Sequence, residues 1–96
     1  MRRDEAFRRL AEHKGDLEGF AVKSLSVFGS VARDEAGPES DIYLLVEFSR
    51  PVGYFHFQHV RTYLEELLGC RVDLVTPNGL REPVRGRVLR EAIRAA

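Results

Sequence analysis

Apolar residues recur along this chain with two different spacings, which predict helices that alternate with strands. At the N-terminus the spacing is three to four residues, and the acidic side chains of Asp4 and Glu5 lie where a helix start favours negative charge. We therefore expect a helix from about Asp4, broken at Gly15 and followed by a second helical piece around Leu17. The same spacing predicts a long helix over residues 54–68.

A last helix is expected from Pro83, because proline suits a first helical turn. Its apolar positions are Val84, Val88, Leu89, Ala92 and Ile93. Its arginines Arg87, Arg90 and Arg94 fall on one stripe, which is typical of a solvated face, with partner binding as the alternative. On the preceding helix, Phe55, Phe57 and Tyr63 are expected in the core, and His56 and His59 as a solvated pair rather than a metal site.

Three segments alternate in the way that is typical of strands: residues 22–28, 42–48 and 71–75. Side chains of a strand point to opposite faces in turn. One face of the second strand carries Ile42, Leu44, Val46 and Phe48, and the other carries Asp41, Tyr43, Leu45 and Glu47. Polar segments that contain glycine or proline separate the elements, at residues 32–39, 50–53 and 76–79.

These elements predict an α/β (α+β) fold of two layers in a single domain over residues 1–96. A small mixed sheet is expected to have its helices packed on the face that carries Ile42, Leu44, Val46, Val72 and Leu74. The other face is then left open. Asp41 and Asp73 are expected to point from it toward whatever the protein binds.

Composition narrows the function classes. The chain has 15 Lys and Arg and 15 Asp and Glu, which gives a formal net charge of zero. Sequence-independent binding to nucleic acid would therefore need a local basic patch. No apolar run approaches the ~18 residues of a membrane span, and the N-terminus lacks a secretory signal, so we expect a cytoplasmic protein. Cys70 is the only cysteine, which excludes an intrachain disulfide and favours a small buried hydrophobe.

The candidate chemistry lies at the strand ends. Two acids separated by one residue on a strand lie on one face, about 6.6–6.8 Å apart along it, which lets them share a pair of metal ions. Asp41 and position 43 have this spacing, and Asp73 from a neighbouring strand supplies a third carboxylate. Gly29 and Ser30 close the first strand, as in a phosphate cradle.

Residues 28–36 read FGSVARDEA, residues 40–48 read SDIYLLVEF and residues 72–77 read VDLVTP. In this order and spacing they resemble the minimal nucleotidyltransferases of the DNA polymerase β-like superfamily. The resemblance implies that Gly29 and Ser30 cradle a triphosphate and that Arg33 meets phosphate charge. It also implies that Asp41 and Asp73 bind Mg²⁺, with Asp73 as a base toward the attacking hydroxyl.

Tyr43 departs from the pattern, because family members generally carry Asp or Glu at this position. A phenol with a pKa near 10 offers a neutral oxygen at neutral pH, and Glu47 lies roughly 13 Å further along the strand. The catalytic acid pair is therefore incomplete at Tyr43, which either fills the metal position with its ring or acts as a ligand. Asp34, where the family often has glycine, is a smaller departure.

The resemblance implies transfer of AMP from ATP, with magnesium, to a hydroxyl of a partner protein. Minimal members of the family are typically paired with a small helical protein of the HEPN type in a toxin–antitoxin pair, and the short chain leaves room for a homo-oligomer. Because activity depends on the acid that Tyr43 replaces, the alternative is a catalytically silent antitoxin module that binds nucleotide or partner. Zero net charge makes nucleic-acid binding the least favoured function.

Overall fold

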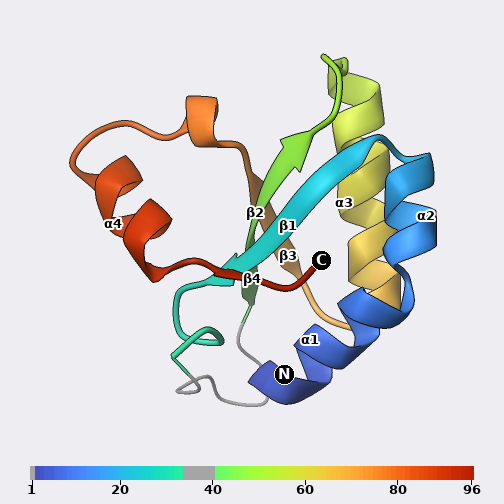
Figure 1. Cartoon of the computed structure of the whole chain (residues 1–96), viewed down its shortest axis with the longest axis horizontal. Helices are drawn as coiled ribbons and strands as arrows, with labels where there is room; N and C mark the ends of the chain where they lie inside the picture. The colour runs from blue at the N-terminus through green and yellow to red at the C-terminus, as the bar shows by residue number, and fades with distance from the viewer. Residues whose placement is uncertain (1, 34–40) are drawn as a thin grey trace.

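The computed structural model describes residues 2–33 and 41–96, which form a mixed sheet with helices on both sides (Figure 1). The strands are β1 (Val22–Phe28), β2 (Ile42–Phe48), β3 (Val72–Val75) and the two-residue β4 (Ile93–Arg94), in the sheet order β3-β2-β1-β4. β1 is antiparallel to β2 and to β4, and β2 is parallel to β3. The mixed α/β architecture is confirmed.

Three helices cover one face of the sheet: α1 (Arg3–Glu12), α2 (Lys14–Gly19) and α3 (Tyr54–Leu68). Helix α3 is the crossover that the parallel pairing of β2 and β3 requires. The core between helices and sheet contains the five residues expected there, Ile42, Leu44, Val46, Val72 and Leu74. From the helices it receives Ala6, Leu10, Leu17, Val60, Leu64 and Leu68.

A fourth helix, α4 (Val84–Glu91), lies on the other side of the sheet, after the short 3₁₀ helix η1 (Pro77–Gly79) (Figure 1). Val88 of α4 and Leu45 of β2 are each only 5% exposed, and neither belongs to the main core. The sequence predicted that the β2 face of Tyr43 is open. Leu45 shares this face and is buried, so the face is not open along its whole length. It is apolar and covered near Leu45.

Two helix boundaries differ from the sequence prediction. The N-terminal helix breaks at His13 rather than at Gly15, which lies within α2. At the break the His13 amide donates to the Leu10 carbonyl, and the ring Nδ1 lies 2.9 Å from the Arg9 carbonyl oxygen. The last helix ends at Glu91, so Ile93 and Arg94 are in β4 rather than on helical stripes. The backbone of Leu25 in β1 exchanges hydrogen bonds with Ala95 and Ala96, which extends the chain there.

The other boundaries agree within one residue. Gly69 ends α3 with a left-handed backbone (φ 70°), as expected of a helix-stopping glycine. The predicted polar segment covers residues 32–39, of which residues 34–39 lie outside the described part of the chain, as does residue 40. Ala32, at the start of the segment, is buried in the core. In the described ranges, every helix is too short or too polar to cross a bilayer.

Candidate functional site

Strand register places three side chains in one row across the sheet. Phe28 of β1 pairs with Tyr43 of β2, and Tyr43 pairs with Asp73 of β3. Paired strands lie about 4.7–4.9 Å apart and register partners share a face, so the Tyr43 side chain leaves the sheet beside the Asp73 carboxylate. Tyr43 is half-buried and Asp73 is exposed.

Gly29 lies beside the Tyr43 side chain in this row. Its backbone is left-handed (φ 78°), and a Cβ added there would lie 3.2 Å from Cδ2 of Tyr43. The Tyr43 ring also packs against Phe28, with ring centroids 5.7 Å apart. The amide of Arg33 donates to the Gly29 carbonyl and closes the turn that contains the half-buried Ser30. The Gly-Ser turn therefore lies directly against the aromatic ring that replaces the expected acid.

Asp41 lies immediately before β2 and is half-buried. The Ile42 amide donates to the Arg71 carbonyl, which ties this strand start to the segment that precedes β3. Burial raises the pKa of the neighbouring Cys70 thiol, and the negative charges of Asp41 and Glu65 raise it further. Cys70 itself is half-buried against the core, close to the role expected for it.

Arg33 connects the site to α4. Its guanidinium forms an ion pair with Glu91, with 3.3 Å between Nη1 and Oε2. The arginine that the sequence assigned to phosphate contact is therefore engaged with the end of α4. A phosphate that recruits Arg33 must compete with this half-exposed carboxylate.

Two carboxylates and one phenol are the candidate metal ligands. Among residues 2–33 and 41–96, no group of three or more His, Cys, Asp and Glu side chains is arranged to hold a metal ion. Mg²⁺ commonly takes one or two protein carboxylates and completes its shell with water and substrate phosphates. Asp41 and Asp73 are carboxylates of the type that such an ion takes, and Tyr43 offers a phenol where a further acid would stand.

Two side chains on α3 differ from their sequence predictions. Phe55, expected in the core, is 85% exposed. His56, expected to be solvated, lies with Nε2 2.6 Å from the Phe20 carbonyl oxygen and contacts the rings of Phe20 and Phe48. Phe57 and Tyr63 do pack against the core. At the first turn of α3, the helical period of the apolar residues does not determine whether Phe55 and His56 point toward the core or toward solvent.

Comparison with known proteins identifies the family of this chain. The family model for the nucleotidyltransferase domain matches residues 6–95, so the chain belongs to the nucleotidyltransferase domain family. The protein adenylyltransferase MntA of Thermococcus cleftensis is 42% identical over 85 residues, which cover 88% of this chain and 86% of the relative.

Solved structures agree with this family. A structure described as a "putative minimal nucleotidyltransferase" has a TM-score of 0.83 and 38% identity, and the match covers 97% of this chain and 95% of the other. A toxin–antitoxin structure with AMP-PNP has a TM-score of 0.75 at 16% identity, covering 94% of this chain and 72% of the other, which is a likeness of fold. The resemblance read from the three sequence motifs is confirmed.

Proposed function

We propose that this chain, as one minimal nucleotidyltransferase domain over residues 1–96, transfers AMP from ATP to a hydroxyl of a helical HEPN-type partner in a toxin–antitoxin pair. The main structural support for the proposal is that Tyr43 and Asp73 are register partners on adjacent strands and that the turn at Gly29 lies against Tyr43. The 42% identity to a protein adenylyltransferase and the fold likeness to a toxin–antitoxin structure with AMP-PNP support the reaction class and the kind of partner.

The reaction needs little covalent help from the protein, because it depends on positioning and on charge stabilisation. The acceptor oxygen forms a bond to the α-phosphorus, the bond from that phosphorus to the departing pyrophosphate breaks, and Asp73 takes the hydroxyl proton. The amides and hydroxyl of Gly29 and Ser30 hold the triphosphate. Mg²⁺, held by Asp41 and Asp73, would neutralise phosphate charge.

Tyr43 limits this reaction in our proposal. Its neutral phenol replaces an anionic ligand, so Asp41 and Asp73 would hold one metal ion where two are usual for this kind of chemistry. We expect transfer to be slow in the chain as it stands. The ring contacts of Tyr43 with Gly29 and Phe28 favour a second candidate, in which the protein binds nucleotide or partner without turnover.

One experiment separates the two candidates. The protein is incubated with magnesium, ATP labelled at its α-phosphate and a candidate HEPN-type partner protein. Label on the partner that disappears with Asp73→Asn supports transfer. A stable complex without label supports the silent module, and neither label nor complex contradicts both candidates.

A further inference from the structure

An ion pair joins the glycine turn of the candidate site to the end of α4. The amide of Arg33 donates to the Gly29 carbonyl, so the backbone of Arg33 is part of that turn. Its guanidinium Nη1 lies 3.3 Å from Oε2 of Glu91, the last residue of α4. A carboxylate from an element 58 residues away in the sequence is therefore held against the cation that the sequence assigned to phosphate contact.

The position of Glu91 follows from the pairing of β4 with β1. Ile93 pairs with Val27 in an antiparallel register. Two steps beyond this pair, the same register brings Glu91 to the level of Gly29. The chain after β4 stays attached to β1 through backbone hydrogen bonds with Leu25. Sheet topology, rather than a chance contact between two surface side chains, therefore places this carboxylate beside the turn.

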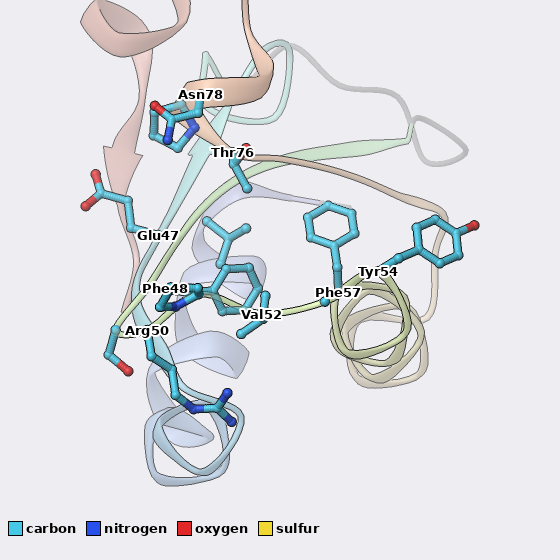
Figure 2. A pocket seen from close by; sticks show the side chains of 13 residues that line it. Glu47, Phe48, Arg50, Val52, Tyr54, Phe57, Thr76 and Asn78 are labelled. Carbon is cyan, nitrogen blue, oxygen red and sulfur yellow. The ribbon is translucent and has the colours of Figure 1, made fainter.

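The groove at the carboxyl end of β2, about 910 Å³ in volume, offers no excess of positive charge to a triphosphate (Figure 2). Among the described residues that line it, Glu47 and Arg50 are charged with opposite signs and the others are uncharged. Neither member of the Arg33–Glu91 pair belongs to this lining. The charge of a triphosphate is therefore better met at the glycine turn.

Both partners of the ion pair are accessible to a ligand. The Arg33 side chain is 48% exposed and the Glu91 side chain is 37% exposed. Ion pairs exposed to this degree shift an equilibrium by only about two- to fivefold. A guanidinium can form two parallel, charge-assisted hydrogen bonds with a phosphate group. A bound triphosphate can therefore displace Glu91 from Arg33, at a modest cost in affinity.

We propose that Glu91 is an intramolecular competitor of the nucleotide: its carboxylate holds Arg33 in the free protein and yields it to the triphosphate when ATP binds. This inference rests on the proposed function and adds a residue that sets the nucleotide affinity of the site. Nucleotide binding then breaks the link between the glycine turn and the end of α4. Because coupling between two sites is reciprocal, a cationic ligand that engages Glu91 raises the affinity for ATP by the factor by which ATP raises the affinity for that ligand.

Isothermal titration of the full chain with ATP and magnesium tests the competition. We expect Glu91→Gln to lower the dissociation constant about two- to fivefold, since it removes the competing charge and nearly preserves the shape of the side chain. Arg33→Gln should raise the constant about tenfold or more, through the loss of a charge-assisted hydrogen bond. Glu82→Gln, which removes an exposed carboxylate just before α4 begins, is the matched control and should leave the constant unchanged.

The double variant shows whether Glu91 acts through Arg33. In the Arg33→Gln background the gain from Glu91→Gln should vanish, because residues that share one interaction contribute non-additively. Arg33→Lys keeps the positive charge at this position and should restore the gain. Circular dichroism establishes that each variant is folded.

Other results overturn the inference in distinguishable ways. Weaker ATP binding by Glu91→Gln would show that Glu91 orients Arg33 for the phosphate, and unchanged binding would show that the ion pair plays no part. A gain that persists with Arg33→Gln would show that Glu91 acts on the nucleotide directly. In these three cases the wild type still binds ATP and the proposed function stands, whereas a wild type that binds no ATP at millimolar concentration would refute nucleotide transfer together with this inference.

Discussion

At the scale of single residues, Tyr43 and Gly29 constrain each other. The space for a side chain at position 29 is taken by the Tyr43 ring, and the left-handed backbone there already favours glycine. An aspartate at position 43 would vacate the ring's place and put a carboxylate beside Asp73. The glycine turn would then face anionic oxygens rather than an aromatic surface.

We predict that Tyr43→Asp raises nucleotidyl transfer to the partner at least about a hundredfold. The substitution completes an acidic triad able to hold two magnesium ions, which are worth several kcal/mol of transition-state stabilisation, and each 1.36 kcal/mol is a factor of ten in rate. Initial rates with labelled ATP measure the gain. Loss of the Phe28 ring contact will lower stability, so circular dichroism must first establish that the variant is folded.

Adding Asp73→Asn to Tyr43→Asp should remove the gain, because Asp73 is the register partner of position 43. Magnesium titration supplies a second measurement, in which Tyr43→Asp should bind the ion more tightly than the wild type. A folded Tyr43→Asp protein with neither faster transfer nor tighter magnesium binding would refute the assignment of the acid row.

Ser30 is the residue on which nucleotide binding can be tested without turnover. We expect ATP with magnesium to raise the melting temperature, because a ligand of the native state alone stabilises it by RT ln(1 + [L]/Kd). Ser30→Ala should reduce that shift through the loss of one phosphate contact. A wild-type melting curve unchanged at millimolar nucleotide would show that the glycine turn is not a phosphate cradle.

The strand face of a residue was predictable where strand period alone decided it. Alternation along residues 41–47 put Asp41 and Tyr43 on one face, and the structure has this face outside the main core. The pairing of Tyr43 with Asp73 needed a register that no local pattern encodes. Phe55 and His56 were misassigned because their environment depends on Phe20 and Phe48, which are distant in sequence.

At the scale of elements, a hydrogen bond between side chains joins α2 and α3 on the covered face of the sheet. The Tyr63 hydroxyl of α3 lies 3.0 Å from the Asp16 carboxylate of α2, to which it donates. Burial, this hydrogen bond and the charge of Asp16 together raise the pKa of Tyr63 from 10.0 to about 12. The neutral phenol is therefore favoured in the folded state.

This shift predicts a dependence of stability on alkaline pH. Because the folded pKa is raised, the contribution of Tyr63 to stability is fully present below pH 10 and is lost as the pH rises through about 12. The difference in phenolate absorbance between wild type and Tyr63→Phe should have its midpoint near 12. Asp16→Asn should lower that midpoint without abolishing the shift, since burial is the largest cause, and an unchanged midpoint would contradict the role of Asp16.

Element boundaries were predictable where a local residue sets them. Gly69 ends α3, and the strands over residues 22–28 and 42–48 begin and end as their alternation indicated. β4 could not be predicted, since two residues carry no period and become a strand only by pairing with Ser26 and Val27 of β1. The position of α4 on the second face likewise depends on tertiary contacts such as Arg33–Glu91.

At the scale of the whole molecule, the chain should not act alone. We predict that it forms a complex with a HEPN-type partner protein, or an oligomer with itself, through α3 or α4. The exposed side chains that motivate this are Tyr54, Phe55, Val84, Leu89 and Ile93. Sedimentation velocity of the protein alone and of the mixture measures the assembly, and a monomer under both conditions would contradict it.

The parallel pairing of β2 with β3 also sets an order of events in folding. The chain must traverse all of α3 before Asp73 can pair with Tyr43, and such long loops are closed late because their entropy cost precedes their contacts. A chain in which only β1 and β2 have paired already brings the Gly29 turn close to the start of β2, and it lacks Asp73, the base in the reaction that we propose. We therefore expect a truncated chain that ends before β3 to show no transfer to a partner.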